Sequence, residues 1–179
     1  MKIYLKALAT FVILGAIVSC TSMHPLERFA EEQRRHIHEK AAYDEAEFDF
    51  WASAMPVTTD DVSRLRAAWE GHSQAFPDSA AMNTVDREMN HPASRVVLVS
   101  LFMTEYDKAD LRDKSLGWTV SPKPEFVTEL SENDVVLRTF MPVRNAWARY
   151  FLLRYPNTEL NEVTVGNRTS RVVLSLLEK

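Results

Sequence analysis

The histidines of this chain are the first residues to consider for catalysis or metal binding. His36 and His38 form a His-x-His pair inside a strongly charged segment that we expect to be helical. Residues two apart on a helix point roughly 200° from each other, so these rings would not easily share an ion, and we predict a solvated surface. His72 and His91 could each act as a general base, although a histidine packed in a core or interface is the commoner case.

Three aspartates offer a second candidate metal site. Asp107, Asp110 and Asp113 recur at three-residue spacing in an expected loop. Calcium sites need converging oxygen ligands, and the lysine and arginine residues interspersed here would compete with a cation, so we predict no metal site. The chain has one cysteine and no Gly-x-Ser-x-Gly motif to mark a nucleophile. The sequence therefore predicts no catalytic residue and no cofactor.

Three aromatic residues are the candidate ligand-binding residues. Trp118, Trp147 and Tyr150 lie near the starts of expected strands, where their rings could line a groove. Large aromatic side chains also fill the cores of β-sandwiches, and that is their commoner role.

The single cysteine, Cys20, lies at the end of an export leader. Lys2 and Lys6 give the leader a positive start, and residues 7–18 form an uncharged apolar run. This run is too short to cross a bilayer comfortably, which takes about 20 residues. The sequence Ile17-Val18-Ser19-Cys20 that ends it resembles the lipobox of bacterial lipoproteins. In that family the cysteine thiol accepts a diacylglyceryl group, and the residues before it are removed.

The resemblance implies a signal peptide of residues 1–19 and attachment to a membrane through lipid on Cys20. Two or more acyl chains make such an anchor stable, since each buried methylene contributes roughly 0.8 kcal/mol. Thr21, where an aspartate would favour inner-membrane retention in enteric bacteria, favours the outer membrane, with the body facing the periplasm. The alternatives are an uncleaved signal anchor and an ordinary secretory peptide cut near Ser22.

The composition and net charge of the chain argue against one class of partner, nucleic acids. Hydrophobic residues make up 46% of the 179-residue chain and the net charge is −4, which are ordinary values for a folded globular protein. The leader contributes two of the positive charges, so the remaining chain is more acidic still. A mildly acidic body argues against nucleic-acid binding, which requires clustered lysine and arginine.

The first half of the chain is expected to be helical. Apolar residues at three- and four-residue steps predict a long helix over residues 25–54, and similar spacing predicts helices over 60–75 and 79–89. The apolar stripe of the first helix must be buried against its own domain, a second copy or a partner. We therefore expect a lipid-anchored helical region over residues 20–92, with two to three helices.

The second half changes to a strand pattern. Short apolar runs separated by proline, asparagine, aspartate or glycine predict about seven strands. They cover residues 96–103, 118–120, 125–130, 135–141, 147–155, 162–165 and 171–177. The expected fold is thus α+β, with the helical region followed by an antiparallel β-sandwich over residues 93–179. An open barrel is the alternative.

The function that these patterns favour is that of an outer-membrane-anchored lipoprotein acting as a non-enzymatic binding or assembly module, with an envelope protein as one candidate partner. The back half, around Leu137-Arg138 and Trp147-Ala148-Arg149-Tyr150, also resembles uncharacterised lipoproteins of Gram-negative bacteria, which implies no activity. The alternatives are a periplasmic enzyme with His72 or His91 as base in a site between helices and sandwich, and a carrier of a small or lipidic ligand.

Overall fold

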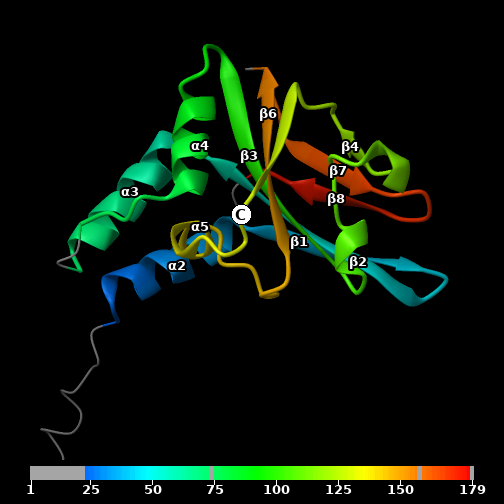
Figure 1. The fold of residues 1–179 in the computed structure, drawn as a ribbon, viewed down its shortest axis with the longest axis horizontal. Coiled ribbons are helices and arrows are strands. Elements are labelled where there is room, and N and C mark those ends of the chain that lie inside the picture. Colours follow the sequence, from blue (N-terminus) through cyan, green and yellow to red (C-terminus); the bar gives the residue numbers. More distant parts are fainter. Residues whose placement is uncertain (1–22, 73–74, 157–158, 178–179) are drawn as a thin grey trace, which may run out of the picture.

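The computed structural model describes residues 23–72, 75–156 and 159–177, and these residues form three layers (Figure 1). A five-stranded antiparallel sheet of order β1-β2-β3-β6-β5 lies in the middle. Helices cover one of its faces, and a three-stranded antiparallel sheet of order β4-β7-β8 covers the other. The expected α+β class is confirmed, but helices and strands alternate along the chain instead of occupying separate halves.

The elements follow one another in this order: α2 Pro25–His36, β1 His38–Asp44, β2 Glu47–Val57, α3 Thr59–Glu70, α4 Ala80–Met89, β3 Ser94–Met103, η1 Tyr106–Lys108, η2 Lys114–Leu116, β4 Thr119–Ser121, β5 Phe126–Leu130, α5 Val135–Phe140, β6 Arg149–Pro156, β7 Glu162–Gly166 and β8 Arg171–Ser175.

The long helix expected over residues 25–54 is wrong beyond its first third. Helix α2 ends at His36, and residues 38–57 form the hairpin β1–β2. Strand β2 pairs with β1 on one side and with β3 on the other, so it is a central strand and is buried on both faces in its second half. Pairing on both sides outweighs the loosely helical spacing of its apolar residues, which is a tertiary effect that a short sequence window does not contain.

The strand expected over residues 135–141 is also wrong, because these residues form helix α5. The carboxylate of Asp134 accepts hydrogen bonds from the backbone N–H groups of Val136 and Leu137, both at 3.0 Å, and so caps the first turn. Val136, Leu137 and Phe140 are buried together on one face of the helix. The helices expected over 60–75 and 79–89 correspond to α3 and α4, and the remaining expected strands to β3–β8.

Alternation along the central strands builds one core on each face of the five-stranded sheet. On β3, Val96 and Leu98 point toward the helices, whereas Val97, Val99 and Leu101 point toward the three-stranded sheet. The apolar stripe of α2 is buried within the molecule: the Phe29 ring stacks on that of Phe140 at 6.3 Å between centroids. Of the three alternatives, burial against its own domain is the one observed, since α2 packs against α3 and α5.

Candidate functional site

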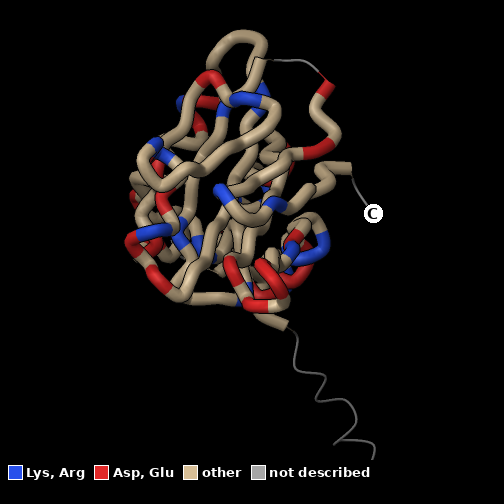
Figure 2. Tube along the Cα trace, turned by 90° about the vertical axis from the view of Figure 1, so that its right-hand side faces the viewer, with Lys and Arg blue, Asp and Glu red and all other residues tan. Residues whose placement is uncertain are grey.

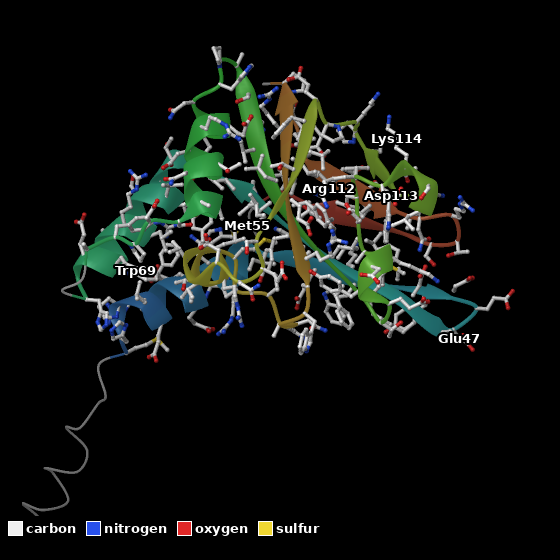
Figure 3. All side chains as sticks on the ribbon, viewed as in Figure 1. Glu47, Met55, Trp69, Arg112, Asp113 and Lys114 are labelled. Atoms are coloured by element: carbon white, nitrogen blue, oxygen red, sulfur yellow. The ribbon has the colours of Figure 1, made fainter. Side chains whose placement is uncertain are left out.

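The helices cover one end of their face of the sheet and leave the other end open. Burial decreases along three successive pairs on this face of β2 and β3. These pairs are Met55 with Leu98, Ser53 with Ser100, and Trp51 with Phe102. The first pair is completely buried under the helices, the serine pair is buried, and the last pair is only partly buried. Figure 3 shows Met55 between the helices and the sheet, and Glu47 at the far end of the hairpin.

A β-bulge adds a further aromatic ring to this open end. Residues Phe50 and Phe48 pair with the consecutive residues Ala42 and Tyr43, so Asp49 is extra in the ladder. The Asp49 carboxylate accepts hydrogen bonds from Asn167 (2.8 Å) and Thr169 (3.1 Å) in the β7–β8 turn. A bulge reverses the alternation of side chains, so Phe48 lies on the face of Trp51 instead of that of Phe50.

Two adjoining hollows at this end form what we call the aromatic groove. The larger has a volume of about 760 Å³ and the smaller about 370 Å³, and Phe102 lines both. Volumes of this order suit small ligands, which bind in hollows of roughly 300–1,000 Å³. Their linings combine aromatic, small and charged side chains. The larger is lined by Phe102, Met103, Thr104, Tyr106, Glu132, Asn133, Arg138, Ala146 and Trp147, and the smaller by Phe48, Trp51, Ser53, Ser100, Phe102, Val143, Arg144, Asn145 and Ala148.

The connection between α5 and β6 holds Trp147 at the rim of the larger hollow. It runs along the lower edge of the molecule in Figure 1. The side-chain oxygen of Asn145 accepts a hydrogen bond from the backbone N–H of Trp147 at 2.9 Å, and the N–H of Ala148 donates to the Asn145 carbonyl. This turn leaves Trp147 75% exposed, although the residue lines the hollow. The groove therefore presents a large apolar ring to solvent.

Three charged residues line the groove. Arg144 forms an ion pair with Glu39 of β1 at 2.7 Å. Arg138 of α5 has no ion pair with any residue that the structure describes. Burial and then the neighbouring Glu132 carboxylate raise the pKa of the Tyr106 hydroxyl. Figure 2 shows acidic and basic residues interspersed along the Cα trace.

A partly buried ion-pair network lies beside the groove. Arg149, at the start of β6, donates to Glu129 at 2.6 Å and to Asp110 at 2.9 Å. Arg112 joins both carboxylates, and its hydrogen bond holds the pKa of Asp110 well below the usual range. The Arg149 guanidinium also lies 5.3 Å from the centre of the Tyr106 ring. The network thus contacts one aromatic residue that lines the larger hollow.

The structure does not bring the three predicted aromatic residues together. Trp147 lines the groove as expected of a ligand-binding residue. Trp118 packs edge-on against Phe50 on the opposite face of the sheet, and its indole N–H donates to the Lys108 carbonyl at 2.7 Å. Tyr150 is buried in the core under the helices, where burial raises its pKa to about 12. Tyr150 is thus a core residue, whereas Trp118 is only partly buried and also lines a separate hollow beside the β7–β8 turn.

The candidate histidines lie outside the groove. His36 ends α2 and is partly buried, and His38 begins β1 and is buried, so the two are not on one continuous helix and the predicted solvated surface is wrong. The imidazole of His72, beyond the end of α3, contacts that of His24, and His91 is exposed before β3. Neither His72 nor His91 lines either hollow.

The three aspartates of the predicted loop have different partners. Asp110 belongs to the Arg149 network, and Asp113 accepts a hydrogen bond from the Ser115 N–H at 2.8 Å, where it caps η2. Asp107 is an exposed residue of η1. Among the described residues, no three His, Cys, Asp or Glu side chains are grouped so that they could hold a metal ion.

The leader and Cys20 lie outside the described residues. Within the part of the chain that the structure describes, no helix is both long and apolar enough to span a bilayer. Comparison of the chain with protein-family models, with curated proteins and with solved structures gives no match.

Sequence reasoning missed most of the groove. Phe48 was expected in the long helix over residues 25–54, Phe102 in a strand and Tyr106 outside the strands, and the bulge that redirects Phe48 has no sequence signature. One signal was present: Ser53 and Ser100 interrupt apolar runs in two central strands. Small polar residues inside such runs indicate a place where the core is not filled, and here they line the smaller hollow.

Proposed function

We propose that this chain is an outer-membrane-anchored lipoprotein that acts as a non-enzymatic binding module of the cell envelope, with the aromatic groove as its binding site. The observation that carries the proposal is Trp147, which a tight turn holds 75% exposed at the rim of a hollow lined by other aromatic rings. Exposed apolar side chains that converge on a concave surface are characteristic of binding sites, because a ligand removes them from water.

The anchor would place this groove near the bilayer. Helix α2 begins five residues after Cys20, and five extended residues span about 18 Å at most. A lipid on Cys20 would therefore keep the folded body close to the membrane surface. Cys20→Ser in the full chain should abolish incorporation of labelled palmitate and release the protein from membranes, whereas Ser22→Ala should leave both unchanged.

The enzyme alternative has less support than the binding module. It requires His72 or His91 beside a substrate site, and both residues lie away from the groove. The carrier alternative requires a space for its ligand. The space between the two sheets is filled by buried side chains, among them Phe151, Val163 and Leu174. A small or lipidic ligand would instead occupy the groove on the opposite face of the five-stranded sheet.

Site-specific photo-crosslinking in living cells tests the proposal. A photoreactive residue at Ala146, which is exposed and lines the larger hollow, should capture a discrete envelope component. The matched position is Val173, which is 39% exposed on β8 in the three-stranded sheet and should capture none. Equal capture at both positions, or none at Ala146, would contradict the groove as the binding site.

A further inference from the structure

The larger hollow of the aromatic groove contains one positive and one negative side chain that do not neutralise each other. Arg138 projects from the exposed side of α5, and Glu132 lies in the turn that precedes this helix. Both line the hollow, yet the ion pairs of the described residues include neither of them. The third charged residue of the groove, Arg144, is by contrast paired with Glu39 at 2.7 Å.

The positive side chain has a free hydrogen-bonding capacity that suits an anion. The structure gives the Arg138 guanidinium no hydrogen bond to a described side chain or carbonyl, whereas its backbone N–H donates to Asp134 within the helix. A guanidinium presents several N–H groups in a planar fork that matches phosphate or carboxylate oxygens. Asn133, in the same lining, adds an amide.

The negative side chain lies among rings that suit a cation. Glu132 is close enough to Tyr106 to interact with its hydroxyl, and Phe102 and Trp147 line the same hollow. Aromatic faces attract ammonium groups through their quadrupoles, and a nearby carboxylate adds charge. The lining of this one hollow thus offers a carboxylate and aromatic rings for an ammonium group and a guanidinium for an anion.

The groove continues from this charged hollow into one that combines aromatic and aliphatic side chains with Ser53, Ser100, Arg144 and Asn145. Phe102 lines both hollows, and beyond it the smaller hollow is lined by Phe48, Trp51 and Val143. The rings of Phe48 and Phe102 lie 6.0 Å apart, which forms a continuous aromatic wall. An alkyl chain lying along this wall would leave its charged head at Arg138 and Glu132.

We infer that the aromatic groove binds a zwitterionic amphiphile, with the anionic group of its head at Arg138, the ammonium group at Glu132 among the aromatic rings, and the alkyl chain along Phe102 and Trp51. The inference rests on the proposed function, of which it names the ligand class. It requires only the groove chemistry, so it can be tested on purified protein independently of capture in cells.

Three probes that share a dodecyl group and differ in their charged head test the anion and cation contacts separately. Native mass spectrometry of the full-length protein, extracted in an uncharged maltoside detergent, would measure binding of dodecylphosphocholine, dodecyl phosphate and dodecyltrimethylammonium. The wild-type protein should bind dodecylphosphocholine about tenfold more tightly than either singly charged probe, since a charge-assisted contact is worth about one decade in affinity.

Two variants assign the charges to residues. Arg138→Gln should remove the advantage of dodecylphosphocholine over dodecyltrimethylammonium, and Glu132→Gln should remove its advantage over dodecyl phosphate. Arg171→Gln and Glu162→Gln, two exposed positions in the three-stranded sheet, are the matched controls and should change neither ratio. Urea unfolding of each variant would show that the fold is retained.

Other results overturn the inference. Equal affinity for the three probes, no binding, or ratios that neither groove variant changes would exclude a zwitterionic ligand. If no probe binds while both variants weaken binding to phosphatidylcholine vesicles, the groove instead contacts a bilayer surface. A protein captured at Ala146 without amphiphile binding would leave the proposed function standing and remove only this inference. Amphiphile binding with the predicted ratios but without capture in cells would support this inference and count against a binding partner in the cell envelope.

Discussion

The two faces of the five-stranded sheet are built by the same strands and yet end in different surfaces. On the face toward the three-stranded sheet, Phe151 of β6 and Val163 of β7 are completely buried. On the helix side, the face is closed at Met55 and Leu98 and becomes an open groove by Trp51. The difference lies in the covering layer, because two sheets can extend over each other while the helices end before the hairpin does (Figure 1). Closed regions supply stability, and the uncovered end is free to bind.

The largest effect expected from this comparison is on stability. Phe151→Ala, in the closed face, should lower the free energy of unfolding by about 3–5 kcal/mol, the usual cost of removing a buried phenylalanine ring. Phe102→Ala, in the groove, should lower it by only about 1 kcal/mol, because the ring is already partly in water. Urea unfolding measures both. Similar losses would mean that the two faces are packed alike.

The second prediction compares two arginines of the α5–β6 region. Arg149→Met should destabilise the protein by about 3 kcal/mol, since the change leaves two partly buried carboxylates short of a partner. Arg144 is 78% exposed in its pair with Glu39, so Arg144→Met should cost less than about 1 kcal/mol. Thermal unfolding of the two variants provides the comparison, and an equal shift in Tm would count against a structural role for the network.

The third prediction concerns acid stability. The Arg112 hydrogen bond holds the pKa of Asp110 below its unfolded value of about 3.9, so Asp110 stabilises the fold above that pH. This contribution is lost as the pH falls toward the folded-state pKa. Asp110→Asn should therefore be less stable than wild type at neutral pH and show a shallower loss on acidification. Unfolding curves between pH 7 and the acid range measure the slope, and an unchanged slope would contradict the assignment.

The fourth prediction is a small gain in stability from a substitution in the β1–β2 turn at the open end. Glu45 and Ala46 both adopt positive φ angles, 45° and 74°, at the β1–β2 turn. Glycine adopts this conformation without steric cost, so Ala46→Gly should stabilise the protein by up to about 1 kcal/mol. Ala41→Gly, within β1, is the control and should destabilise it by a similar amount. A loss of stability in Ala46→Gly would show that the turn differs from this description.

The sequence predicted the parts of this fold that depend on local signals. Helices α3 and α4 follow from a capping threonine or serine and apolar spacing, and β3 from an apolar run. The secondary structure predicted for residues 38–57 and 135–140 was wrong, because tertiary contacts determine the structure of both segments. Strand β2 depends on pairing with β3, and α5 depends on burying Leu137 and Phe140 against α2. Neither context lies within a short window of sequence.

The candidate site was less predictable than the fold. Trp147 was found because a tryptophan near a strand start is conspicuous, but the groove around it needs a bulge at Asp49 and helices that stop short of the hairpin. Residues such as Phe102 and Arg138 acquire their role only from that geometry. The lipid anchor stays a prediction, and it rests on a purely local pattern, a leader that ends in the chain's single cysteine.

Trp147 is the residue whose removal should change stability least and binding at the groove most. Trp147→Ala should change the free energy of unfolding by less than about 0.5 kcal/mol, because the ring is 75% exposed. The decisive measurement is the photo-crosslinking yield at position 146 in the chain that carries Trp147→Ala. We predict that the yield falls to the level of the Val173 position while stability is retained. An undiminished yield would contradict the claim that the uncovered end of the sheet is where this protein binds.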